Sequence, residues 1–359
     1  MSIEELTINH VRIIEHAELN PSSHVNVITG LNAAGKSTIL ESIDILSRGR
    51  SFRTHLFNRL VTAGQSQLTV TARLKSPEHS ILSIGIEKSA SGTRVRMGGE
   101  PVESIAQLAA SLPVQVLHPE SHQLIQGGPA LRRAYLDWGM FHVEPKFLPV
   151  WQRHQRALRQ RNAALRTGAS LKAIRAWHRD FCETADCIDR YRREYLRYLI
   201  PVVDDYARNL PGAARLEFRY QRGWPDTDEL EHVMEQEISL DMDRGHTRWG
   251  PHRAELGLLV DGRPASGTAS RGQQKLIAAA LRLAQARLLI EKTGRQCVFL
   301  IDDLSAELEP RYRDFLLRAL VRLNLQIFIT AIEADDVKRS DWVETRRFHV
   351  EQGRVRELL

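Results

Sequence analysis

Residues 30–38 of this 359-residue chain read GLNAAGKST, the most informative motif in the sequence. It matches the phosphate-binding template of Gly, four residues, Gly, Lys, and Ser or Thr. Residues 25–29, VNVIT, predict a short buried strand before it, and apolar residues at 39, 40, 43 and 46 predict a helix after it. Because a phosphate site requires strand, loop and helix in this order, a chance glycine-rich turn is the weaker interpretation.

A loop of this kind holds phosphates with its backbone N–H groups and with the positive end of the following helix. We therefore expect Lys36 to reach the β- and γ-phosphate oxygens of ATP or GTP and Ser37 to contact Mg²⁺. The predicted nucleotide-binding residues are Gly30, Leu31, Asn32, Ala33, Ala34, Gly35, Lys36, Ser37 and Thr38. The motif is strong evidence for phosphate binding, but it does not identify the reaction that takes place at the site.

The composition, 42% hydrophobic and 26% charged, is that of an ordinary folded globular protein. Lys and Arg total 50 against 44 Asp and Glu, and the net charge of +6 mildly favours an anionic partner such as nucleic acid. The three cysteines have no metal-type spacing and predict neither a disulfide framework nor a zinc site. With no apolar leader and no run near ~18 apolar residues, we expect a cytoplasmic protein without a membrane partner and not a transporter.

Short alternating apolar pieces predict strands on both sides of the first helix. Residues 1–20, 67–74 and 82–86 alternate with a period of two, which favours an antiparallel region. Gly98 and Gly99 predict a hairpin turn. A further strand at 112–117 ends before Pro119, which prevents its simple continuation.

From about 129 to 242 the sequence becomes helical, and Pro or Gly residues, Pro201 among them, predict its breaks. Arginines crowd residues 151–199, and helical spacing puts several on one face, where they could follow a phosphate backbone. The candidate DNA-binding residues are Arg153, Arg156, Arg159, Arg190, Arg193 and Arg197. The alternative is a solvated face with ion pairs within the helices. A basic loop at 48–53, RGRSFR, is likewise either a solvated helix exit or a nucleotide or DNA contact.

Two later stretches complete the pattern. Ser270 is a good N-cap for a long helix whose exposed N–H groups could bind a second anion. The apolar strand 297–301 ends in Asp302 and Asp303, so Asp302 is expected to bind Mg²⁺ and Asp303 to orient an attacking water. The alternative for Asp303 is an acid at a helix start. A helix at 311–323 and a strand at 326–330 then alternate as in a doubly wound α/β sheet.

The P-loop, SRGQQK at 270–275 and the strand ending in two Asp residues resemble the ABC-type ATPase superfamily in its chromosome-maintenance branch. Five further strings resemble the RecF family of bacterial DNA replication and repair proteins. They are LESIDILSRGRSFR at 40–53, QGGPALRRAYLD at 126–137, ALRQRN at 157–162, GPHRAEL at 250–256 and LIDDLSAEL at 300–308.

The resemblance implies an α/β, ABC-type ATPase lobe with a mixed sheet, formed by residues 1–128 and 247–359, and an inserted, mainly helical lobe at 129–246. It implies slow, DNA-stimulated ATP hydrolysis with Mg²⁺ and ATP-dependent binding to DNA as a duplex, a gap or a single-stranded junction. It also implies cooperation with RecO and RecR to place RecA on gapped DNA coated with single-strand-binding protein.

The resemblance also assigns residues. Lys36, Asp302 and Asp303 become the catalytic residues, and Asp303 replaces the Glu usual in ABC ATPases, which suits slow turnover. The signature residues Ser270, Arg271, Gly272 and Gln273 would contact ATP held by a second copy, so that ATP joins a homodimer. Residues 305–309 match the D-loop, with Glu309 in place of Asp. Thr330 stands where most ABC proteins have a switch His, and Ala33 stands where Gly is common.

Three functions are compatible with all or part of this pattern. The first is an ATP-gated DNA clamp that hydrolysis opens. The alternative is a nucleotide-switched binding module that recruits RecR and whose ATPase activity is incidental. A P-loop kinase or small-molecule ATPase explains neither SRGQQK nor the arginine-rich helices.

Overall fold

The computed structural model describes residues 1–75, 81–209, 215–304, 309–333, 337, 342 and 344–358. The chain forms two compact units, the first from Met1–Ser121 with Leu281–Leu359 and the second from His122–Ala280. The predicted boundaries at 129 and 246 follow changes in secondary-structure character, whereas these units are defined by packing.

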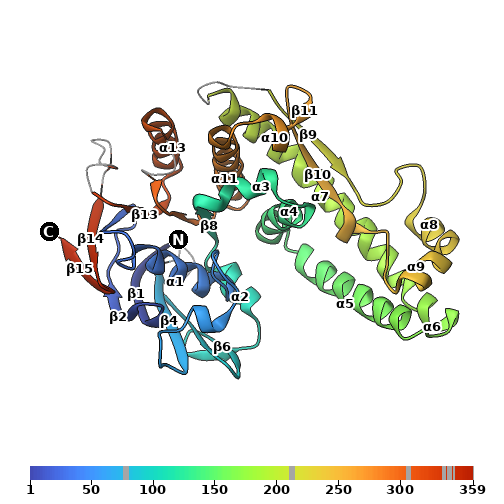
Figure 1. The fold of residues 1–359 in the computed structure, drawn as a ribbon, viewed down its shortest axis with the longest axis horizontal. Helices are drawn as coiled ribbons and strands as arrows, with labels where there is room; N and C mark the ends of the chain where they lie inside the picture. Colours follow the sequence, from blue (N-terminus) through green and yellow to red (C-terminus); the bar gives the residue numbers. More distant parts are fainter. Residues whose placement is uncertain are drawn as a thin grey trace. The chain divides into compact units, whose positions relative to one another are not determined.

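The central sheet of the first unit combines strands from both ends of the chain (Figure 1). Among the described residues its order is β15-β14-β3-β13-β12-β8, with parallel pairing from β14 to β8 and an antiparallel edge strand, β15. This confirms the predicted α/β class with a mixed sheet. Every residue of β3, β13, β12 and β8 is buried, which explains why these strands are mainly apolar in sequence. The bounds are β3 Val25–Thr29, β8 Val114–Leu117, β12 Val298–Ile301, β13 Gln326–Ala331, β14 Thr345–Glu351 and β15 Arg354–Leu358.

A second, antiparallel sheet of the first unit confirms the strands predicted from alternation. Its order over the described residues is β2-β1-β4-β5-β6-β7, and Gly98 and Gly99 form the turn between β6 and β7. In β4 buried and exposed residues alternate, so one face of the sheet meets the core. The bounds are β1 Ser2–Val11, β2 Ile14–Leu19, β4 Gln67–Lys75, β5 Leu82–Ser89, β6 Gly92–Met97 and β7 Glu100–Val102.

Helix α1, Lys36–Arg48, packs into the core that the two sheets share. Its predicted apolar face at Ile39, Leu40, Ile43 and Leu46 is fully buried there. The other helical segments of the first unit are η1 Phe57–Arg59, α2 Ile105–Ser111 and α13 Pro310–Leu323. The short η2, Pro119–His122, lies where the first unit gives way to the second, and the long α11, Arg271–Thr293, begins in the second and ends in the first.

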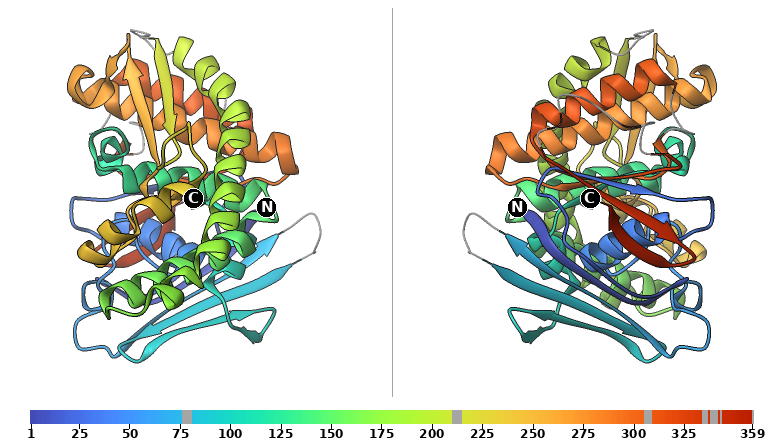
Figure 2. Two further views of the ribbon diagram at one scale, coloured as in Figure 1. Left: turned by 90° about the vertical axis from the view of Figure 1, so that its right-hand side faces the viewer. Right: turned by 90° about the vertical axis from the view of Figure 1, so that its left-hand side faces the viewer.

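The second unit is mainly helical, with a small sheet of order β11-β10-β9 among the described residues. Helices α5 and α7 form an antiparallel pair, since Phe147 meets Tyr191 near one end and Arg153 meets Asp180 nearer the other (Figure 2). The helices are α3 Gln123–Gln126, α4 Pro129–Val143, α5 Phe147–Arg166, α6 Leu171–Arg175, α7 His178–Arg208, α8 Leu230–Gln236, α9 Ile238–Arg244 and α10 Ala265–Thr268. The remaining elements are β9 Leu216–Gln221, η3 Pro251–Arg253, β10 Glu255–Val260 and β11 Arg263–Pro264.

Two expectations for this stretch were wrong. Residues 216–221 form strand β9, because pairing with all six residues of β10 outweighs the local helical character. Helix α7 also continues through Pro201 instead of breaking there. An interior Pro costs a helix about 3 kcal/mol, but burial of Val202 and Val203 contributes about 1.5–3 kcal/mol each. None of the described helices has the length and apolar character needed to cross a membrane.

A buried ion pair joins α5 to α9. Arg161 Nη1 lies 2.8 Å from Asp241 Oδ2, with both side chains almost completely buried, and the same nitrogen donates to Thr247 Oγ1 at 2.6 Å. Removal of one partner leaves the other charge buried and uncompensated. This arginine is therefore structural, although it lies within the basic stretch.

We predict that Arg161→Met or Asp241→Asn lowers the free energy of unfolding by about 3–5 kcal/mol. Arg153→Met, on the same helix but in an exposed ion pair, should cost about 0–1 kcal/mol. Urea denaturation followed by circular dichroism measures both effects. Equal losses for the buried and exposed arginines would contradict the assignment.

Candidate nucleotide site

The predicted P-loop connects β3 to α1. Gly30 has φ +148°, and a Cβ there would overlap the carbonyl oxygen of Val350 on β14. Gly35, φ +115°, occupies the N-cap of α1, which has no side-chain cap and no acidic residue in its first turn. The N–H groups and positive end of this helix thus remain available to an anion.

Ala33 shows what the loop requires of its backbone. Its φ is +63°, in the left-handed region that costs a residue with a Cβ about 1–2 kcal/mol. The sequence indicated that Ala33 departs from a glycine common in the family. The structure shows the conformation that makes glycine favourable there.

The Lys36 side chain folds over the loop. Its Nζ donates hydrogen bonds to the carbonyl oxygens of Gly30 at 2.6 Å and Leu31 at 2.9 Å. Burial lowers the pKa of Lys36, and the carboxylates of Asp303 and Asp302 oppose that change. The ammonium group is therefore held by the loop carbonyls, and its positive charge would attract phosphate oxygens.

Three neighbouring strands bring the remaining predicted groups together. Ser37 follows β3, Thr330 lies on β13 and Asp302 follows β12, and these strands are adjacent in the sheet. Ser37 Oγ donates to Asp302 Oδ1 at 2.7 Å, and Thr330 Oγ1 donates to the same oxygen at 2.9 Å. The other oxygen, Oδ2, takes part in neither bond.

These oxygens fit a magnesium ion. Mg²⁺ prefers hard oxygen ligands and is usually bound by one or two protein groups together with substrate phosphates. A hydroxyl and a carboxylate, 2.7 Å apart beside the loop, are such groups. Ser37 and Asp302 would hold the ion, which when bound would neutralise phosphate charge.

Asp303 and Thr330 are coupled through the backbone. The Asp303 N–H donates to Thr330 Oγ1 at 2.8 Å, and Asp303 has the left-handed φ of +57°. Thr330 thus holds both Asp residues, with its hydroxyl completely buried. The sequence does not reveal that Thr330, at the predicted switch position, bonds both Asp residues. The one signal for it is the expected adjacency of the strands that end at Asp302 and Thr330.

The predicted signature residues, 270–273, lie at the start of α11. Ser270 Oγ accepts from the Gln273 N–H at 3.3 Å, while Gln273 Oε1 accepts from the Ser270 N–H at 2.8 Å, which is a capping box. Arg271 and Gly272 are exposed. These four residues belong to the second unit, whereas the P-loop and Asp302 belong to the first. Of the predicted D-loop, 305–308 lie outside the described residues, and Glu309 precedes α13.

The candidate DNA-binding arginines differ in their surroundings, although all six are exposed. Arg153 pairs with Asp180 and Glu183, and Arg193 pairs with Asp189 and Asp226. Arg190 lies over the ring of Tyr191. The remaining three have no ion pair among the described residues, namely Arg156, Arg159 and Arg197.

The basic loop after α1 is tied to that helix. Arg48 pairs with Asp44 at 2.6 Å, and Arg53 lies 3.6 Å from the buried Glu41. Glu41 also pairs with Arg12 at 2.7 Å, a contact that sequence reasoning missed. Because their guanidinium groups pair with carboxylates of α1, Arg48 and Arg53 fit a helix exit better than a nucleotide or DNA contact.

Comparison with known proteins extends over the whole chain. The family model described as RecF/RecN/SMC N terminal domain matches residues 2–355. A DNA replication and repair protein RecF from Thioalkalivibrio sulfidiphilus (strain HL-EbGR7) is 41% identical over 357 residues, which cover 99% of each chain. The RecF of Pseudomonas entomophila (strain L48) is 39% identical over 360 residues, covering 99% of this chain and 98% of that one.

Solved structures agree with these relatives. The recombination mediator protein RecF with ATP, of the RecFOR pathway, superposes with a TM-score of 0.90 at 25% identity, covering 100% of this chain and 98% of that one. An Smc head bound to the C-winged helix domain of ScpA has a TM-score of 0.59 at 12% identity, with 100% and 98% covered, and supports the fold alone.

We predict that Thr330→Val lowers the rate of ATP hydrolysis at least tenfold while leaving ATP affinity within about threefold. Valine keeps the shape but leaves the partly buried Asp303 N–H without this acceptor and the buried Asp302 without one donor, and an unsatisfied buried group costs about 1–3 kcal/mol. Steady-state hydrolysis and equilibrium binding of a fluorescent ATP analogue measure the two quantities. Thr330→Ser, which keeps the hydroxyl, is the control. A valine variant that hydrolyses ATP at the wild-type rate would contradict the proposed importance of the Thr330 hydroxyl for hydrolysis.

Proposed function

The chain belongs to the RecF family of DNA replication and repair proteins, and from that premise we propose that it is an ATP-gated DNA clamp. ATP with Mg²⁺ joins two copies around DNA, and slow hydrolysis releases them. The observation that carries this proposal is the array of Lys36, Ser37, Asp302 and Thr330 at the carboxyl ends of adjacent strands, since it offers cation, hydroxyl and carboxylate groups where a nucleotide and its metal would lie.

Gly272 supports the dimer. It lies in the first turn of α11 without a left-handed φ, and a Cβ there would meet nothing closer than Ser270 Oγ at 4.0 Å. Packing within the described part of the chain therefore does not require glycine, which costs a helix about 1 kcal/mol relative to alanine. Close approach of a phosphate accounts for the glycine at 272. A second copy would hold this phosphate, because each chain has one P-loop and one predicted signature.

The acidic pair supports slow turnover. Asp303 is one methylene shorter than the Glu usual in ABC ATPases, and its backbone is fixed by Thr330. A threonine hydroxyl does not titrate near neutral pH as a switch histidine does. A slow hydrolytic step suits a protein that must stay on DNA for some time after binding ATP.

DNA and protein partners follow from the family. We propose that exposed arginines of α5 and α7 contact phosphates of duplex, gapped or single-stranded junction DNA, with Arg156, Arg159 and Arg197 the readiest to do so. RecR and RecO, and through them RecA, are the proposed partners, because related structures are assigned to the RecFOR pathway. The place of action would be the cytoplasm.

We expect ATP with Mg²⁺, but not ADP, to convert the wild-type chain from monomer to dimer in sedimentation velocity. Ser270→Arg should remain monomeric because its side chain fills the space of the γ-phosphate. Gly272→Ala should also stay monomeric while its melting temperature is unchanged or higher, since alanine favours the helix. Gly267→Ala, at a glycine with open surroundings in α10, is the matched control and should dimerise normally. A dimerising Gly272→Ala variant would refute the composite site.

The alternative is a nucleotide-switched module that recruits RecR. Thr330 in place of a switch histidine and the short Asp303 side chain also suit this alternative, because it does not need efficient hydrolysis. Asp303→Asn distinguishes the two, because it should keep ATP binding but lose hydrolysis. For a clamp, labelled duplex DNA should leave the ATP-bound variant at least tenfold more slowly than the wild type, and Lys36→Arg should not form the stable complex. Equal release rates for Asp303→Asn and the wild type would favour the switch.

A further inference from the structure

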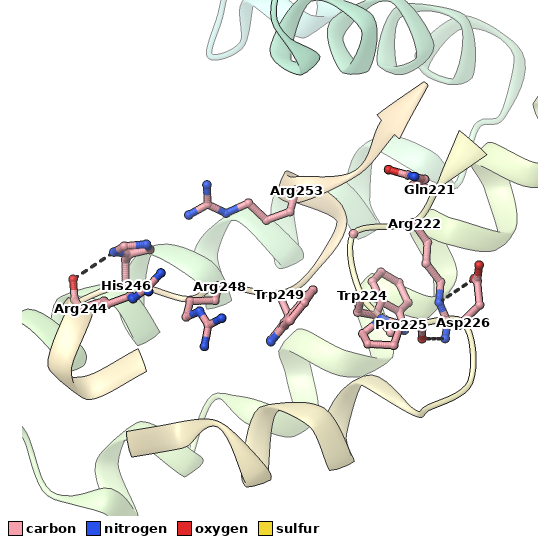
Figure 3. A pocket seen from close by; sticks show the side chains of 11 residues that line it. Gln221, Arg222, Trp224, Pro225, Asp226, Arg244, His246, Arg248, Trp249 and Arg253 are labelled. Atoms are coloured by element: carbon pink, nitrogen blue, oxygen red, sulfur yellow. Dashed lines mark hydrogen bonds and ion pairs between the residues drawn. The ribbon is translucent and has the colours of Figure 1, made fainter. Parts of the chain in front are cut away.

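A basic, aromatic pocket lies in the second unit, formed by the loop that follows β9 and by the segment between α9 and β10 (Figure 3). Its volume is about 660 Å³, within the range of roughly 300–1,000 Å³ that small-ligand sites occupy. The lining includes four arginines and two tryptophans, namely Arg222, Arg244, Arg248, Arg253, Trp224 and Trp249. The nucleotide site, which lies in the first unit, uses none of them.

Arg253, which lines the pocket, belongs to the string GPHRAEL at 250–256, and ATP chemistry leaves this string unexplained. Three arginines from α4 and α7 hold its backbone or its acidic residue. Arg192 donates to the Pro251 carbonyl at 2.8 Å, and Arg133 donates to the Ala254 carbonyl at 2.8 Å. Arg132 binds both oxygens of Glu255, at 2.7 and 2.8 Å. The segment is thus fixed on both sides of the exposed Arg253.

The aromatic walls are oriented as well. Glu237 Oε2 accepts from Trp249 Nε1 at 2.6 Å and from Arg248 Nη1 at 2.8 Å, which sets the indole and its neighbouring guanidinium group together. Across the pocket, the Arg222 guanidinium lies 4.6 Å from the Trp224 ring centroid. Such stacked, hydrogen-bonded groups lose little freedom when a ligand binds.

The charge of the pocket is unbalanced. Arg244 and Arg253 are exposed and have no ion pair among the described residues. The one acidic side chain in the lining, Asp226, is engaged by Arg222 at 3.3 Å and Arg193 at 3.2 Å. Figure 3 shows Arg244, Arg248 and Arg253 around His246, on the side away from Asp226. An anion would meet several guanidinium donors there.

We propose that this pocket binds an unpaired nucleotide of a DNA strand, with its phosphate at Arg244 and Arg253 and its base against Trp249. This inference rests on the proposed DNA-binding function and names a part of the DNA that it recognises. A cavity admits a single nucleotide, whereas a duplex presents its phosphates on a convex surface. Any base can stack on an indole ring, whereas the carboxylates of an acidic peptide would bind the arginines without stacking on the tryptophans.

The test measures binding of fluorescein-labelled dT12 to the full-length chain by anisotropy at several salt concentrations. Arg244→Gln with Arg253→Gln should weaken binding about tenfold or more. It should also reduce the slope of log Kd against log salt by about 0.7, because the two arginines would hold one phosphate of a single strand. The matched control is Arg208→Gln with Arg263→Gln, which removes the same charge from the second unit. Arg263 lies beyond the far end of β10, and neither control residue lines the pocket.

Equal weakening by the two double variants, or no weakening by either, overturns the proposal. The proposal is also overturned if the Arg244→Gln, Arg253→Gln variant loses as much affinity for a 12-base-pair duplex as for dT12. The same holds if an acidic nonapeptide binds more tightly than dT12 and depends on the same two arginines. Failure of the clamp would appear separately, as the absence of ATP-dependent dimerisation in sedimentation.

A second measurement does not depend on how the variants fold. A dT12 strand carrying 5-iododeoxyuridine is photocrosslinked to the wild-type chain, and the adducts are located by mass spectrometry. Adducts on residues 221–226 or 244–253 support the pocket. Adducts confined to other segments overturn it.

Discussion

The hydrogen bonds that converge on Asp302 Oδ1 are the constraint on which the nucleotide site depends. Ser37 and Thr330 both donate to this oxygen, and they come from segments nearly three hundred residues apart in the chain. The bonds form because β3, β13 and β12 are adjacent and parallel, so that their carboxyl ends meet at one edge of the sheet. The central sheet is thus what converts distant motifs into one site.

The same sheet explains why the two ends of the chain must fold together. β14 pairs with β3, and its Val350 carbonyl limits Gly30 to a residue without a side chain. The Gly353 N–H, in the turn after β14, donates to the Ala34 carbonyl at 2.9 Å. The C-terminal hairpin therefore supports the loop that the N-terminal strand delivers, and the loop's strained backbone at Ala33 is held from outside.

The arginines of the second unit have different physical roles, and their positions in the sequence do not show which arginine has which role. Arg161 and Arg192 are buried and paired, and they hold α5 and α7 to neighbouring segments. Arg153 and Arg193 lie in exposed ion pairs. Arg253 is exposed and unpaired among the described residues. A count of arginines therefore overstates the charge available to DNA, because burial and pairing remove part of it.

The P-loop, the strand ending in Asp302, the capped start of α11 and the family could be predicted from sequence alone, because each depends on residue types at short, fixed spacing. The sequence also predicted most strands of the first unit, where alternation reports burial directly. Only the tertiary structure decided that Thr330 bonds both Asp302 and Asp303, that α7 passes through Pro201 and that 216–221 is a strand. It alone decided which arginines are buried and that Arg244, Trp249 and Arg253 share a pocket. These outcomes depend on pairing and packing between segments far apart in the chain, and such long-range energies outweigh the local preferences that a sequence displays.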